Sequence, residues 1–225
     1  MTQRLIIRLI PLEIFVLSIL AGFLAVMGVR GLVGATDMPA AAETAVAGAA
    51  LAFAPAPANG ALAPIFTPEV QHWSDKILAW SSFFKIDPNL AATVMQIESC
   101  GAPGVVSSSG AQGLFQVMPF HFDAGEDMQD PDTNAGRGLA YLALGLTRAS
   151  GNAGLALAGY NGGHSMIGLD SSLWPAQTQR YWYWGTGIYQ DALDGQAQSA
   201  RLQEWLNAGG ASLCSTASQQ LGLAQ

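Results

Sequence analysis

The chain has 225 residues, of which 50% are hydrophobic and only 11% are charged, and its formal net charge is -7. This length suffices for one ordinary globular domain with an additional segment, and the apolar content excludes a disordered protein. The negative charge and the lack of a basic cluster exclude a nucleic-acid partner, since phosphate binding needs a basic surface.

An apolar segment of membrane length opens the chain. Residues 9–29 are apolar except for Glu13 and Ser18, and two arginines precede them. About 20 apolar residues span a bilayer, so residues 1–33 are predicted to form a transmembrane anchor. The two arginines favour a cytoplasmic amino terminus and place the rest of the chain outside the cytoplasm. A long, cleaved signal peptide is the alternative, and it would make the protein secreted.

The next segment, residues 34–66, has the composition of a linker. It is rich in alanine, proline and glycine, and the stretch "APAPANG" prevents a continuous helix. Residues 67–225 are then predicted to form one folded domain with a closing helix and a carboxy-terminal tail.

Two helices are predicted at the start of this domain. Thr67 can cap the first, with Pro68 in its first turn, and apolar residues recur on one face as far as Phe84. Asp87 can cap the second helix, which is apolar over much of its surface and carries Glu98 in its last turn.

Glu98 is the only carboxylate in residues 95–119. At the end of a helix it faces the negative end of the helix dipole, and its apolar neighbours disfavour its charge, so both effects raise its pKa. A raised pKa suits a general acid near neutral pH. An exposed glutamate at a frayed helix end is the alternative.

Five acidic residues crowd the loop from 123 to 132. Asp130, Asp132 and Asn134 have the alternate spacing of a calcium loop, but the glycine and the closing acid of such a loop are absent. A solvated loop is predicted instead, with Asp132 or Thr133 capping the next helix. One of its acids could still supply the site with a second carboxylate. No metal site is predicted here or at the three histidines.

The remaining predicted elements are also helical. A short apolar helix ends at a Gly-Gly turn that could present Tyr160 and Asn161. The aromatic run at residues 181–184 is predicted to pack within a helix, and an amphipathic segment around Leu202 and Trp205 predicts a closing helix.

Cys100 and Cys214 are the only cysteines. Outside the cytoplasm an even pair predicts a disulfide, which here would join the loop beside Glu98 to the end of the final helix. Closing so long a loop contributes about 4–5 kcal/mol in the chain-entropy model. Two independent buried thiols are the alternative.

Several of these segments together resemble the soluble lytic transglycosylase (SLT) domain family of the lysozyme-like superfamily. The motifs span about residues 70–195 and are "ES" at Glu98, Ser107, "GAQGLFQVMP", "NAGRGLAYLALGL", "ALAGYNGG" and "TQRYWYW". The resemblance implies a mainly α, lysozyme-like helical domain with a peptidoglycan-binding groove. It also implies that Glu98 is the catalytic acid and that the substrate is bound around it by Ser107, Gln116, Met118, Tyr160, Asn161 and Tyr181.

The function that the resemblance implies is that of a peptidoglycan lytic transglycosylase. Such an enzyme cleaves the MurNAc-GlcNAc β-1,4 bond without water and leaves a 1,6-anhydroMurNAc end, with Glu98 as the single general acid and base. Residues 99–119 fit this chemistry because they lack the second carboxylate of a hydrolase. In the similar goose-type lysozymes, acids lie where this chain has Ser107 and Met118, which argues against hydrolysis. A lysozyme-type hydrolase and an inactive glycan-binding module remain the alternatives.

The expected partners follow from this function. They are peptidoglycan glycan strands, the membrane through the amino-terminal helix, and cell-envelope machinery. The catalytic domain would face the extracytoplasmic space, and no cofactor is expected.

Overall fold

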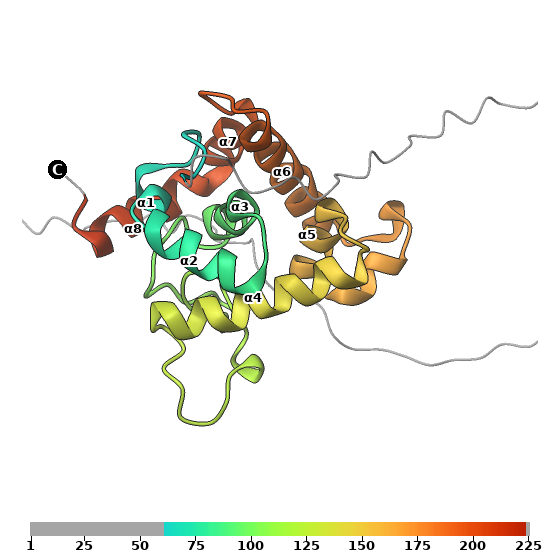
Figure 1. Cartoon of the computed structure of the whole chain (residues 1–225), viewed down its shortest axis with the longest axis horizontal. Helices are drawn as coiled ribbons and strands as arrows, with labels where there is room; N and C mark the ends of the chain where they lie inside the picture. Colours follow the sequence, from blue (N-terminus) through green and yellow to red (C-terminus); the bar gives the residue numbers. More distant parts are fainter. Residues whose placement is uncertain (1–60, 224–225) are drawn as a thin grey trace, which may run out of the picture. The chain divides into compact units, whose positions relative to one another are not determined.

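The computed structural model describes residues 61–223, and this part is helical (Figure 1). Extended backbone pairs there only in two isolated bridges, Val106 with Gln112 and Gln112 with Val117. The predicted mainly α class is therefore confirmed. The predicted anchor of residues 1–33 and most of the linker lie outside the described residues. Among residues 61–223, no helix combines the length and the apolar character needed to cross a bilayer.

The helices follow one another closely along the chain. In order they are α1 (Pro68–Gln71), α2 (Ser74–Phe84), α3 (Pro88–Glu98), η1 (Pro119–His121), α4 (Pro131–Arg148), α5 (Ala153–Gly162), η2 (His164–Gly168), η3 (Ser171–Leu173), α6 (Ala176–Leu193), α7 (Ala200–Trp205), η4 (Leu206–Gly210) and α8 (Ala211–Leu221). The elements labelled η are single 3-10 turns, except η4, which is a π-helical turn.

The buried helix α3 positions Glu98. It starts as predicted, because the side chain of Asp87 accepts a hydrogen bond from the backbone N–H of Asn89 (2.8 Å) and Pro88 occupies the first turn. Every residue from Pro88 to Ile97 is buried, and α1, α2 and α6 pack against the helix (Figure 1). Since α3 is enclosed on several sides, its last residue, Glu98, has a fixed place in the core.

The first predicted helix is broken in two. Trp73 has non-helical backbone angles and separates α1 from α2. Its indole N–H donates to the carbonyl oxygen of Gly101 (2.9 Å), so the break brings the ring to the segment that follows α3. Thr67 precedes α1 but does not cap it, because its hydroxyl lies 3.2 Å from the sulfur of Cys100 instead.

The domain begins earlier than predicted. The backbone N–H of Ala63 donates to the side chain of Asn89 (2.9 Å), and its carbonyl oxygen accepts from Gln71 (2.8 Å). The predicted linker boundary at residue 66 is therefore too late. An apolar stretch that contains proline and has no helical period resembles a linker in sequence, although these side chains are buried in the core: Leu62, Ala63, Ile65 and Phe66.

Helix α4 begins at Pro131, before either of the predicted cap residues. Asp130 caps it, with its carboxylate accepting from the N–H of Thr133 (2.9 Å), whereas Asp132 or Thr133 was the predicted cap. Asp132 instead accepts from Lys76 (2.8 Å) and from the indole of Trp80 (2.9 Å), which ties α4 to α2. The proline at the first helical position is the sequence signal that identifies the true start.

The carboxy-terminal part forms several helices, α6 to α8, rather than one closing helix and a tail. Helix α6 packs against α3 and α5, and α7 follows it. The chain then turns at Gly209, which has a φ of +126°, a value that favours glycine. Helix α8 returns from this turn to pack against α1 (Figure 1).

Candidate active site

Glu98 is the carboxy-terminal residue of α3, and protein atoms enclose most of its carboxyl group. The side chain keeps partial access to solvent, so a ligand can reach it. Burial raises the pKa of Glu98 from 4.5 to about 8, in the direction that the sequence predicts. The carboxyl group therefore holds its proton at neutral pH, as a general acid must.

Two tyrosine hydroxyls are the electrostatic neighbours of this carboxyl group, one from α5 and one from α6. Burial, and then the charge of Glu98, raise the pKa of both Tyr160 and Tyr181 well above the ordinary value of 10. Both hydroxyls therefore stay protonated. That of Tyr160 donates to the backbone carbonyl oxygen of Phe115 (2.7 Å), which ties the site to the loop after α3.

Tyr181 carries a buried hydroxyl that has no hydrogen-bond partner among residues 61–223. It is close enough to lower the pKa of Glu98, against the larger effect of burial, but it does not reach hydrogen-bonding geometry with that carboxyl. An unpaired buried polar group costs about 1–3 kcal/mol. Such a group calls for a partner that arrives with a ligand or a water.

Ser107 and Gln116 maintain the shape of the loop between α3 and η1. The N–H and the Oγ of Ser107 pair with the carbonyl oxygen and the N–H of Ala111, both at 2.9 Å. The side-chain amide of Gln116 donates to the carbonyl oxygens of Val105 (3.1 Å) and Gly113 (2.9 Å). Both side chains therefore form hydrogen bonds to the loop backbone in this structure.

Asn134, which resembles a calcium ligand in sequence, is a buried support for the same loop. Its Oδ1 accepts from the N–H of Phe115 (2.8 Å), and its Nδ2 donates to the carbonyl oxygens of Gln112 and Met128 (both 2.8 Å). A Cβ at Gly113 would lie 2.6 Å from this amide, so the position has no room for a side chain. Asn134 thus fixes Phe115, whose carbonyl oxygen holds Tyr160.

The other two predicted site residues are less closely linked to the carboxyl group. Met118 is half-buried just before η1. The side-chain oxygen of Asn161 accepts a hydrogen bond from Thr178 (3.1 Å) and so links α5 to α6. Of the predicted residues, Tyr160 and Tyr181 are the two whose pKa values the charge of Glu98 raises.

A row of aromatic rings leads outward from Tyr160. The ring centroids of Tyr160 and Tyr141 are 5.8 Å apart, those of Tyr141 and His121 4.9 Å, and those of His121 and Phe120 4.5 Å. The outermost ring, Phe120, is 75% exposed. Rings of this kind can pack against the apolar face of a sugar. These residues come from three separate segments, so no local sequence pattern joins them.

The five acids of the 123–132 loop have partners of their own. Among residues 61–223, burial and the Tyr181 hydroxyl are the causes of the pKa shift of Glu98. The loop acids bond to other groups, and the pairs are Asp123 and Glu126 with Arg137, Asp127 with Gln129, Asp130 with Thr133, and Asp132 with Lys76 and Trp80.

One group of metal-ligand residue types occurs in the described part of the chain. It consists of Glu69, Cys100 and Cys214, whose ligand atoms lie within 4.8 Å of one another. The two sulfurs form a disulfide with each other (2.02 Å), so they offer no thiolate to a metal ion.

The part of the chain that carries Glu98, Tyr160 and the loop between them is similar to known proteins. Residues 75–180 match the family model described as "Transglycosylase SLT domain". The "Transglycosylase" of Enterobacteria phage PRD1 is 36% identical over 111 residues, which cover 48% of this chain and 40% of that protein. The "Membrane-bound lytic murein transglycosylase E" of Buchnera aphidicola is 28% identical over 88 residues, which cover 33% of this chain and 40% of that protein.

Among solved structures, the lytic transglycosylase Slt of Pseudomonas aeruginosa is 21% identical, with a TM-score of 0.39 over 67% of this chain and 24% of that chain. This chain therefore spans well under half the length of the relatives that it matches.

Proposed function

We propose that this chain is a peptidoglycan lytic transglycosylase, because residues 75–180 match the model of the transglycosylase SLT domain family. The names of its relatives support this activity. The observation that carries the proposal is Glu98, a half-buried carboxyl group that is protonated at neutral pH. A single protonated carboxyl is the group that a non-hydrolytic cleavage needs.

In the proposed reaction Glu98 acts twice. It first donates its proton to the glycosidic oxygen, so that the bond from the MurNAc anomeric carbon breaks and the GlcNAc hydroxyl leaves. The N-acetyl oxygen of MurNAc stabilises the positive charge at that carbon. The C6 hydroxyl of the same sugar then attacks the carbon and returns its proton to Glu98, which leaves a 1,6-anhydro ring and consumes no water.

Tyr181 can assist between the two steps. The carboxyl group of Glu98 becomes negative when it has given up its proton, and the Tyr181 hydroxyl is a protonated donor beside it without another partner in the described residues. A hydrogen bond to a charged acceptor is about twice as strong as one between neutral groups. The hydroxyl would therefore stabilise the intermediate more than the resting enzyme, which is the condition for catalysis.

A lysozyme-type hydrolase is the weaker candidate. It would need a second carboxylate as nucleophile or base. The acids of the 123–132 loop, which are the candidates for such a group, bond to Arg137, Lys76 and backbone N–H groups. These pairs support cleavage by the substrate's own hydroxyl.

Product analysis tests the proposal directly. The full-length protein is expected to release muropeptides from purified peptidoglycan that are lighter than hydrolytic products by one water and that resist borohydride reduction. A digest with a hydrolytic muramidase serves as the control for reducible ends. Reducible, hydrated ends from this protein would establish hydrolysis instead, and retained glycan binding without any release would indicate an inactive module.

Tyr181→Phe is expected to slow lysis by about tenfold, because the variant loses one hydrogen bond to a charged group. The hydroxyl lowers the pKa of Glu98, so its removal raises that pKa, and the alkaline limb of the pH–activity profile should move to higher pH. Tyr183→Phe, on the same helix but with its hydroxyl bonded to Glu204 (3.2 Å), is the matched control. Identical pH–activity profiles for the two variants would show that the Tyr181 hydroxyl takes no part in the reaction.

The arrangement of the whole chain belongs to the same proposal. We propose that residues 1–33 anchor the protein in a membrane, that a linker follows, and that the domain from about residue 62 onward acts outside the cytoplasm. The apolar run at residues 9–29 supports this arrangement, and the relative from Buchnera is named as membrane-bound. Cell-envelope machinery that needs an opened wall would then be its partner.

A further inference from the structure

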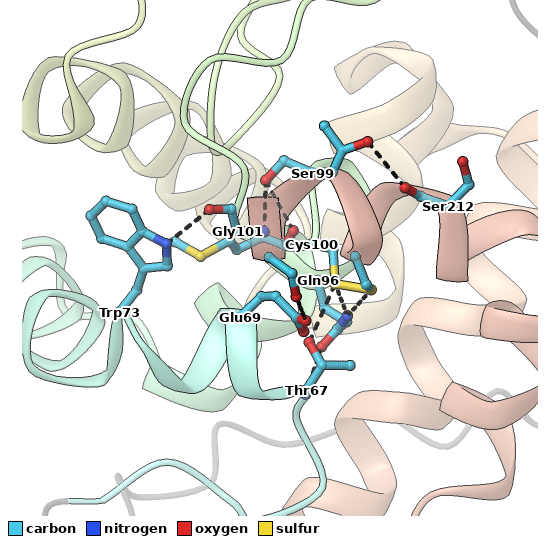
Figure 2. Close-up of a disulfide and its surroundings, with 12 residues drawn as sticks. Thr67, Glu69, Trp73, Gln96, Ser99, Cys100, Gly101 and Ser212 are labelled. Carbon is cyan, nitrogen blue, oxygen red and sulfur yellow. Dashed lines mark hydrogen bonds between the residues drawn. A yellow bond between two sulfur atoms is a disulfide. The ribbon is translucent and has the colours of Figure 1, made fainter. Parts of the chain in front are cut away.

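The short segment that directly follows α3 is fixed by bonds to distant parts of the chain (Figure 2). The hydroxyl of Ser99 donates to the carbonyl oxygen of Leu114 (2.7 Å), which lies in the loop that carries Gln116. The carbonyl oxygen of Gly101 accepts from the indole of Trp73 (2.9 Å). The end of α3 is thus tied to two other segments.

Helix α8 makes two further ties to the same segment. The disulfide joins Cys214 of α8 to Cys100, which follows Glu98 by two positions. The side chain of Gln220, also on α8, accepts from the N–H of Gly104 (2.9 Å). The last helix of the chain therefore holds the backbone next to the proposed catalytic acid.

Buried polar groups surround the disulfide and extend this link (Figure 2). The amide of Gln96, on α3, donates to the sulfur of Cys100 (3.0 Å) and accepts through its oxygen from the N–H of Thr67 (3.1 Å). The hydroxyl of Ser218, on α8, donates to the carboxylate of Glu69 in α1. These bonds connect α8, α1 and the last turn of α3 into one unit.

The backbone of Cys100 has a conformation that needs support. Its φ is +51°, in the left-handed region, which costs a residue with a side chain about 1–2 kcal/mol. The disulfide removes the freedom to leave that conformation. If the sulfur–sulfur bond opens, the residues after Glu98 can relax toward ordinary backbone angles and carry the end of α3 with them.

Helix α8 contributes few of the buried side chains of the core. The buried side chains of α8 are Cys214 and Ala217, whereas the largest fully buried side chains belong to other elements, among them Ile77, Leu90 and Phe115. Leu213 and Leu221 of α8 also pack, partly buried, against the core. Loss of α8 would still expose less apolar surface than loss of α3, which is buried from Pro88 to Ile97, so we expect α8 to detach without global unfolding.

We propose that the Cys100–Cys214 disulfide is a positioning element for Glu98, and that a dithiol reductant switches the enzyme off by releasing α8 while the core stays folded. In that step the sulfur–sulfur bond breaks, both cysteines become thiols, and the dithiol is oxidised to its own disulfide. The inference rests on the proposed lytic activity.

The test compares the oxidised and the dithiothreitol-reduced full-length protein in lysis of purified peptidoglycan over a range of pH. Reduction is expected to lower the rate at least tenfold, since a displacement of about 1 Å in a catalytic group can cost 100-fold. The alkaline limb should also move to lower pH, because water that reaches the carboxyl of Glu98 reduces the burial that raises its pKa. Reoxidation should restore both.

Cys214→Ser provides the matched control for the reductant itself. This variant should have the low rate and the shifted pH limb from the start, and dithiothreitol should change neither. An unchanged rate and limb after reduction of the natural protein would overturn the inference, and so would loss of its helical circular dichroism, since the core is expected to survive. If the oxidised protein releases no anhydro products, the proposed function fails instead.

Discussion

Replacing Glu98 with glutamine is expected to abolish lysis of peptidoglycan and to leave the fold intact. Glutamine has nearly the same shape but carries no proton that it can donate, so both the bond-breaking step and the ring-closing step lose their catalyst. General acid–base catalysis contributes about 10²–10⁴-fold for a positioned group. We expect a loss at the upper end of that range, measured as the release of anhydro-muropeptides per unit time.

Glu126→Gln is the control for this experiment. Glu126 pairs with Arg137 (2.7 Å) in the loop whose acids are the candidates for a second carboxylate, and its replacement should leave most of the lytic rate. Binding of Glu98→Gln to sedimented peptidoglycan should match that of the natural protein. Unchanged lysis by Glu98→Gln would contradict the assignment of Glu98, and loss of activity in Glu126→Gln would revive hydrolysis.

Local signals in the sequence were sufficient for some of the fold. Asp87 followed by Pro88 specifies the start of α3 through a cap and a preset backbone angle, and both lie next to each other in the chain. The placement of Glu98 in the last turn follows from that start and from the apolar run between them. The direction of its pKa shift was predictable for the same reason, because burial of α3 was evident from its composition.

Features set by long-range contacts could not be predicted in this way. Apolar residues recur at helical spacing through Trp73 without interruption. The helix nevertheless breaks there, because the indole of Trp73 bonds to Gly101, in the segment that follows α3. Residues 62–66 read as linker because their burial depends on Asn89 and Gln71. In each case the deciding partner lies outside the window that a local pattern covers.

In the candidate site, too, local patterns predict some features and not others. Tyr181 has helical spacing with Gly185 and Ile188, which predicts that it faces the core. This spacing does not indicate that its hydroxyl lies near Glu98 without a hydrogen-bond partner. Likewise, Asn134 has the spacing of a calcium ligand, although its amide supports Phe115. Polar groups in a core take their role from what they meet, so their function appears only once the helices are packed.

Glu98→Gln is also expected to stabilise the domain at alkaline pH. The pKa of Glu98 is about 8 in the folded protein and about 4.5 when the chain is unfolded. Between these values the unfolded chain releases a proton that the folded protein retains, so the natural protein loses stability as pH rises through this window. The full shift corresponds to roughly 5 kcal/mol, an upper bound because solvent partly reaches the carboxyl.

Melting temperatures at pH 4, 6 and 9 measure this effect. The two proteins should melt together at pH 4, where the carboxyl is protonated in both states, and the variant should melt about 5–10 °C higher at pH 9. Glu126→Gln should behave in the opposite sense. Arg137 lowers the pKa of Glu126, so that its stabilisation is present above the unfolded pKa and is lost in acid. A constant difference between Glu98→Gln and the natural protein across this range would mean that the carboxyl is ionised in the folded protein at neutral pH, and Glu98 could then not begin the reaction as an acid.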